Sequence, residues 1–145
     1  MNRQELENII IGTLLESNDD ENYFDECRCS VVPEMFSDEH NRRIFIKIAE
    51  MNAKGITTTS PSEILATYGD EVIDLVCDMT DRVNNYSFLY RKTVYNEMRR
   101  LKSFYDGSIP RYSDCSFTKY VTGFIKLVYE EDRKQSAAVR PSAAA

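Results

Sequence analysis

The sequence predicts an all-α protein: a compact head of five or six helices, followed by a long antiparallel helical hairpin. Apolar residues recur at spacings of three and four along most of the 145-residue chain, which is typical of amphipathic helices. Glycine, proline and capping residues separate these segments. Strand-like patterning is confined to the short β-branched run 56–59, which is too short to indicate a sheet.

Composition indicates one ordinary globular domain with acidic character. The chain is 42% hydrophobic and 29% charged, with a net charge of −6, which disfavours a protein whose main task is to bind nucleic-acid phosphates. The beginning of the chain lacks the layout of a signal peptide, and no apolar run approaches the roughly 20 residues of a membrane span. We therefore expect a cytoplasmic protein whose four cysteines are free thiols.

The first helix is expected over Arg3–Glu16, and spacings of three and four place five of its residues on one face: Leu6, Ile9, Ile10, Thr13 and Leu14. Gly12 lies inside this helix, where glycine costs about 1 kcal/mol relative to alanine. We therefore expect another backbone to approach closely at Gly12. A short helix should follow around Tyr23 to Cys27 and end before Pro33. Met35 and Phe36 then anchor the connecting loop.

Capping signals define the next three helices. Ser37 or Asp38 can cap a helix that carries an apolar stripe and stops at Gly55. Ser60 and Glu63 form a capping box around Pro61, and Gly69 ends the short helix that follows. The stripe of the first of these helices is Ile44, Phe45, Ile48 and Met51 or Asn52. In a helix beginning at Asp70, the residues expected to face inward are Val72, Ile73, Val76 and Met79.

The strongest periodic signal predicts the hairpin. Asn84 or Asn85 can cap a helix over 85–105, a turn contains Gly107 and Pro110, and the last helix begins near Ser116. We therefore divide the chain into a domain over 1–135, with the head at about 1–82 and the hairpin at about 83–135, and a flexible tail or linker remnant over 136–145.

The hairpin is unusually rich in aromatic residues, which cannot all be buried with their hydroxyl groups satisfied. They are candidates for an oligomer or partner interface, although a satellite core between the hairpin helices would use the same residues. The candidate interface residues are Tyr86, Tyr90, Tyr95, Tyr105, Tyr120, Phe124 and Leu127.

The charge of the chain is uneven. Residues 1–40 hold eleven acidic residues against Arg3 and Arg28, whereas residues 82–105 hold six basic residues against Glu97. Such a dipolar molecule suits self-association or an oriented partner. A basic set in the second region is interleaved with Tyr90 and Tyr95 and could contact single-stranded nucleic acid, although a solvated helix face explains it more simply. This set is Arg91, Lys92, Arg99, Arg100 and Lys102.

Motifs for chemistry are missing from the sequence. The five glycines form no phosphate-binding loop, so we expect no nucleotide cofactor. Cys27, Cys29 and His40 have no common zinc-site spacing and are interpreted as structural residues. His40 is the single histidine and no nucleophile accompanies it, so we expect no catalytic residues, no metal and no enzymatic activity.

The order of these features resembles the N-terminal domain of DnaB-type replicative helicases. Residues 5–15 (ELENIIIGTLL) resemble the opening helix of that family, and Pro33-Glu34-Met35-Phe36 with His40, Arg42, Ile44 and Phe45 resembles its second signature, with one extra residue after His40. Residues 85–101 are similar to the first hairpin helix. The resemblance covers about residues 5–105; the loop containing Gly69 is shorter than in the family, and the ATPase domain of the helicase is absent.

This resemblance implies a non-catalytic protein-interaction and oligomerisation module of bacterial DNA replication. In the family, the hairpins pair into dimers that build a collar, and the collar receives the C-terminal domain of primase. The expected partners are therefore primase, the replicative helicase and further copies of the chain. The alternatives are a single-stranded nucleic-acid binder that uses the basic face of 85–105, or a stand-alone adaptor or loader-type regulator of the helicase. A helicase-binding domain of a primase ranks below these, since it is not expected to carry the signature at 33–45.

Overall fold

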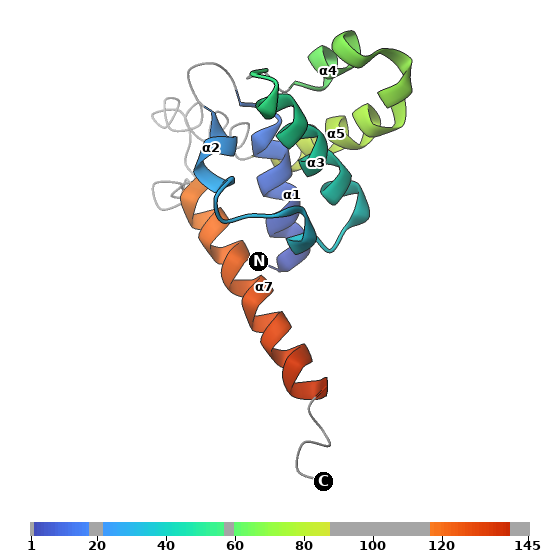
Figure 1. The fold of residues 1–145 in the computed structure, drawn as a ribbon. Helices are drawn as coiled ribbons and strands as arrows, with labels where there is room; N and C mark the ends of the chain where they lie inside the picture. The colour runs from blue at the N-terminus through green and yellow to red at the C-terminus, as the bar shows by residue number, and fades with distance from the viewer. Residues whose placement is uncertain (1, 18–21, 57–59, 88–116, 140–145) are drawn as a thin grey trace, which may run out of the picture.

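The computed structural model describes residues 2–17, 22–56, 60–87 and 117–139, with side chains up to residue 135. These ranges are helical and contain no strand, which confirms the predicted all-α class. Figure 1 shows the helices gathered around α1. The elements are α1 (Arg3–Leu14), α2 (Tyr23–Cys27), η1 (Pro33–Met35), α3 (Glu39–Ala53), α4 (Pro61–Tyr68), η2 (Gly69–Val72), α5 (Ile73–Tyr86) and α7 (Phe117–Val139).

Helix α1 lies at the centre of the fold. It packs against α3, α5 and α7, so that little of its surface reaches solvent after the first turn. Ile10, Ile11 and Leu14 are fully buried, and the burial of such side chains stabilises the fold by about 1.5–3 kcal/mol each. The central position explains why the apolar residues of this segment cover more than one helical face.

Short polar side chains begin α3 and α4, as the sequence predicts. Asp38 Oδ1 accepts hydrogen bonds from the backbone N–H groups of His40 and Asn41, at 2.7 and 3.2 Å. Ser60 Oγ accepts from the N–H of Glu63 at 3.4 Å, which is one half of the predicted capping box. Gly55 and Gly69 both adopt a φ of 75°, a left-handed conformation that favours glycine after a helix.

An aromatic cluster joins α7 to the head. The ring of Phe36 lies 5.0 Å from Phe45 of α3 and 5.3 Å from Phe124 of α7, measured between centroids. Tyr23 of α2 meets Phe117 edge to face at 5.2 Å. Phe36 and Phe124 are both fully buried. The last helix is therefore part of the core rather than a separate arm, as far as the described residues show.

Three local expectations differ from the structure. Asn84 and Asn85 do not cap a new helix, because α5 continues through them to Tyr86; the Asn85 amide instead donates to Asp81 within α5. Ile73 is 47% exposed, and Leu75 is buried in its place. The backbone of α7 continues to Val139, beyond the predicted start of the tail at residue 136. The boundary between head and hairpin, at residues 82 and 83, falls inside α5.

Candidate interaction surfaces

The close approach expected at Gly12 places α5 directly against α1. A Cβ atom added to Gly12 would lie 2.6 Å from the carbonyl oxygen of Arg82 and 3.1 Å from the backbone nitrogen of Ser87. Both neighbours are backbone atoms, which cannot move aside as a side chain can. The expectation is confirmed, and the missing side chain of Gly12 fixes the distance between α1 and the end of α5.

A buried polar chain sets the orientation of α5. Asn41 of α3 donates its amide to Asn8 Oδ1 of α1 at 2.8 Å, and its Oδ1 accepts from Arg82 Nε of α5, also at 2.8 Å. Asn41 is fully buried. Because a buried amide without partners is costly, this chain favours one relative placement of α1, α3 and α5.

A buried carboxylate connects α1 to the start of α3. Glu7 is fully buried and accepts hydrogen bonds from the Ser37 backbone N–H at 3.1 Å, from the Ser37 hydroxyl, and from the Asp38 N–H at 3.2 Å. Arg3 Nε lies 3.8 Å from Glu7, and the same guanidinium donates to Glu131 of α7 and to the carbonyl of Met35. The head and α7 are therefore linked by charge as well as by apolar packing.

Three contacts hold α4 and α5 against α3 and the residue that follows it. His40 Nδ1 lies 2.7 Å from a carboxylate oxygen of Asp78, so the single histidine pairs with a neighbouring helix. The ammonium groups of Lys47 and Lys54 lie 4.6 and 5.4 Å from the ring centroid of Tyr68, on α4. Cations at this distance are attracted to the negative face of the ring.

The segment beyond these contacts, from α4 to α5, presents an acidic surface. Residues 60–81 contain six acidic residues and no lysine or arginine. We define the acidic lobe by four exposed carboxylates that form no ion pair with another described residue: Glu63, Asp70, Glu71 and Asp74. Leu65 and Ile73 lie on the same segment and are 37% and 47% exposed. The charge run is visible in the sequence, but the exposure of Ile73 was not predicted.

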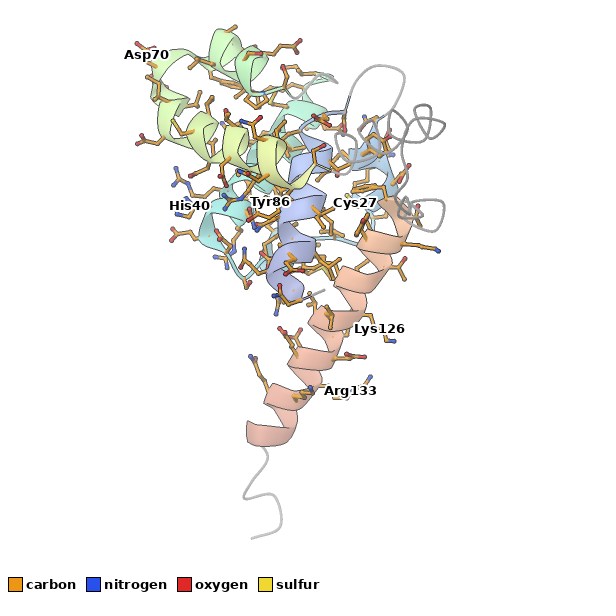
Figure 2. The ribbon with its side chains drawn as sticks, turned by 180° about the vertical axis from the view of Figure 1, so that it is seen from behind. Cys27, His40, Asp70, Tyr86, Lys126 and Arg133 are labelled. Carbon is orange, nitrogen blue, oxygen red and sulfur yellow. The ribbon has the colours of Figure 1, made fainter. Side chains whose placement is uncertain are left out.

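Helix α7 has two different faces. Its inner face supplies Phe117, Val121 and Phe124 to the core. On its outer face, positions 126, 129 and 133 follow one another at helical spacing and therefore share a side. We call Lys126, Tyr129 and Arg133 the α7 stripe; all three are exposed, Tyr129 at 58%. Figure 2 shows Lys126 and Arg133 on the side of α7 that faces away from α1.

The interface residues predicted from the sequence lie in different places. Tyr120 and Phe124 are buried against the head of the same chain, Leu127 is partly buried against that core, and Tyr86 is partly buried at the end of α5. Tyr120 and Phe124 thus do not form an exposed interface in this structure, because they pack inside a single chain. Outside the described residues lie Tyr90, Tyr95 and Tyr105, and also the basic set Arg91, Lys92, Arg99, Arg100 and Lys102.

The cysteines of the described ranges are free thiols with different surroundings. Cys27 is buried, and its Sγ donates to the carbonyl of Phe24 at 3.6 Å, whereas Cys29 and Cys77 are exposed. Burial, with a contribution from Glu26, raises the pKa of the Cys27 thiol to about 12. Across the described ranges, histidine, cysteine and acidic side chains form no group of three or more suited to a metal ion.

Comparison with known proteins identifies the first part of the chain. Residues 1–67 match the sequence model of the DnaB-like helicase N terminal domain. No curated protein and no solved structure matches the chain significantly. Among the described helices, none is long and apolar enough to cross a membrane. The resemblance seen in the sequence is therefore confirmed for residues 1–67, which carry the features of a DnaB-like helicase N terminal domain.

Proposed function

We propose that this chain is a non-catalytic protein-interaction and oligomerisation module of bacterial DNA replication, comparable to the helicase collar that binds primase and assembles the hexamer. The match of residues 1–67 to the DnaB-like helicase N terminal domain carries this proposal. The matched segment contains α1, α2, α3 and most of α4, which together with α5 and α7 form one packed head.

The chemistry of the described residues supports a binding role. Their buried polar groups are used to fix helices to each other: Glu7 holds the start of α3, and Asn41 joins α1 to α5. The remaining exposed features are charged and apolar surfaces, which recognise partners by complementary charge and burial of apolar area. Primase, helicase and self-association are the partners that this proposal includes.

Light scattering of the chain, alone and during titration with the C-terminal domain of the host primase, tests the proposal. A complex whose mass equals the sum of the two components is the expected result. If the chain takes up neither primase nor the replicative helicase at moderate salt, the proposed role in replication is wrong, although the fold is unaffected. A steeply salt-dependent affinity for single-stranded DNA that is lost in Arg99→Glu/Arg100→Glu would favour the nucleic-acid alternative instead.

A further inference from the structure

Two exposed surfaces of this chain are complementary in charge. The acidic lobe offers four carboxylates, Glu63, Asp70, Glu71 and Asp74, without an ion-pair partner among the described residues. The α7 stripe offers the cations of Lys126 and Arg133, which likewise make no ion pair within the described ranges. Opposite charges on two surfaces steer their encounter and determine its orientation.

The same two surfaces also carry exposed apolar area. Tyr129 lies between the two cations of the α7 stripe, one helical turn from each, and is 58% exposed. Leu65 and Ile73 belong to the segment that carries the acidic lobe. These three residues are among the five large hydrophobic side chains that are exposed in the described part of the chain, with Val32 and Ile46 as the others. Tyr129 combines an apolar ring with a polar hydroxyl, and this combination suits a protein–protein interface.

The two surfaces are too far apart to meet within one chain. Figure 1 shows α4 and the beginning of α5 on one side of the molecule, while α7 runs along the other side and extends past the N-terminus of α1. Figure 2 shows Asp70 and Arg133 near opposite ends of the structure, with the head between them. Contacts such as Arg3 to Glu131 and Phe36 to Phe124 hold α7 in this position. Only a second copy can therefore bring the α7 stripe to the acidic lobe.

We propose that the chain associates head to tail, with the α7 stripe of one copy docked on the acidic lobe of the next. The contact is heterologous, because each copy contributes a different surface, so that it produces a ring when the rotation closes and an open array when it does not. The inference deepens the self-association part of the proposed function, and it does not depend on primase. Since exposed ion pairs are weak and screened by salt, the assembly should form at low ionic strength and dissociate at high ionic strength.

Paired charge reversals test this contact. The variant Asp70→Lys/Glu71→Lys/Asp74→Lys gives the acidic lobe three positive charges against Glu63, so that both surfaces are basic. The variant Lys126→Glu/Arg133→Glu makes both surfaces acidic. Each variant alone should lose self-association, with a dissociation constant raised by about tenfold or more. An equimolar mixture should assemble again, because the basic lobe of one variant then faces the acidic stripe of the other, and the copies must alternate.

Sedimentation velocity at about 0.05 M and about 0.5 M salt measures these outcomes. Glu26→Lys/Glu34→Lys/Glu39→Lys and Arg28→Glu/Arg43→Glu are the matched controls, since they change the same number of charges at exposed positions on α2, η1, α3 and the turn after α2. Both controls should assemble like the unmodified chain. Circular dichroism verifies that each variant is folded. If a reversed variant does not fold, the neutral variants Asp70→Asn/Glu71→Gln/Asp74→Asn and Lys126→Gln/Arg133→Gln replace the reversals, and each should still weaken self-association.

The proposal is overturned when the unmodified chain stays monomeric at low salt, when either reversed variant assembles normally, or when the mixture fails to reassemble. These outcomes differ from failure of the proposed function. A chain that assembles through these surfaces but ignores primase and helicase keeps the head-to-tail contact and loses the role in replication. A chain that stays monomeric but binds primase loses the head-to-tail contact and keeps the role in replication.

Discussion

The carbonyl oxygen of Arg82 lies 2.6 Å from the position that a Cβ atom of Gly12 would occupy. This relationship defines how α5 crosses α1, and α5 in turn carries Asp74 of the acidic lobe. Gly123, within α7, has a very different neighbourhood: among the described residues, a Cβ there would meet only Leu6 Cδ1, at 3.9 Å. The two glycines therefore offer a matched pair of substitutions.

Gly12→Ala should destabilise the fold although alanine is the better helix former. The new methyl group would overlap backbone atoms of α5, and forced overpacking costs about 1–3 kcal/mol, which exceeds the helix-propensity gain of about 1 kcal/mol. Gly123→Ala meets ordinary contact distances and should be neutral or stabilising by up to about 1 kcal/mol. Urea unfolding followed by circular dichroism measures both changes. Equal stability of the two variants would contradict the close approach at Gly12.

Glu7→Gln should destabilise the protein by about 1–3 kcal/mol. The carboxylate accepts from the N–H groups of Ser37 and Asp38 and from the Ser37 hydroxyl. In glutamine an NH2 group replaces one of the two accepting oxygens, so that a donor would face a donor there. Glu5→Gln, in the same helix but exposed, should change stability by less than about 0.5 kcal/mol. Thermal unfolding of the two variants compares them. A neutral Glu7→Gln would mean that the buried network is dispensable.

Phe124→Ala should act on folding rather than on association. The ring is fully buried and packs on Phe36, and removal of a buried phenylalanine costs about 3–5 kcal/mol. Tyr129→Ala, on the exposed face of the same helix α7, should leave the unfolding free energy at high salt within about 0.5 kcal/mol. Denaturant unfolding and sedimentation separate the effects. A folded Phe124→Ala chain that only loses self-association would restore the interface predicted from the sequence.

Capping residues and glycines predicted helix boundaries correctly where they act only on residues next to them in the sequence. Asp38, Ser60 and Gly69 do so, because their effect depends on hydrogen bonds and φ angles within one turn. Asn84 and Asn85 carry the same type of signal, but α5 continues through them. An asparagine can cap a helix or lie inside one, and in the folded chain the Asn85 amide donates to Asp81.

Tertiary packing determines which face of a helix is buried, and helical periodicity in the sequence does not show this. A helical stripe shows which residues share a face but not what covers it, so Ile73 was expected to be buried although Leu75 is the buried residue. The same ambiguity affected Tyr120 and Phe124, which could serve a partner or the head until the position of α7 was known. The exposed position of Tyr129 likewise follows from the rotation of α7 against the core.

Cys27 and Cys77 should differ strongly in reactivity toward iodoacetamide. The thiolate is the reactive form, and burial raises the pKa of Cys27 to about 12 from the ordinary 9.0, while Cys77 is exposed. At about pH 8, Cys77 should be alkylated rapidly and Cys27 only as fast as the chain unfolds. Mass spectrometry of the peptides after quenching measures both rates in one experiment. Labelling of Cys27 at the rate of Cys77 would show that the α2 region is open.

The same thiol makes stability depend on alkaline pH. Because the pKa of Cys27 is higher in the folded chain than the ordinary 9.0, its contribution is fully present below about pH 9 and declines as the pH rises toward about 12. The denaturation midpoint should therefore fall with pH above about 9, and Cys27→Ala should show a shallower fall despite its lower stability at neutral pH. Urea unfolding of both chains at several pH values between about 8 and 11 gives the two slopes. Equal slopes would mean that ionisation of Cys27 is not linked to folding. The cavity left by the alanine substitution does not change the slope, because it lowers the free energy of unfolding by the same amount at every pH.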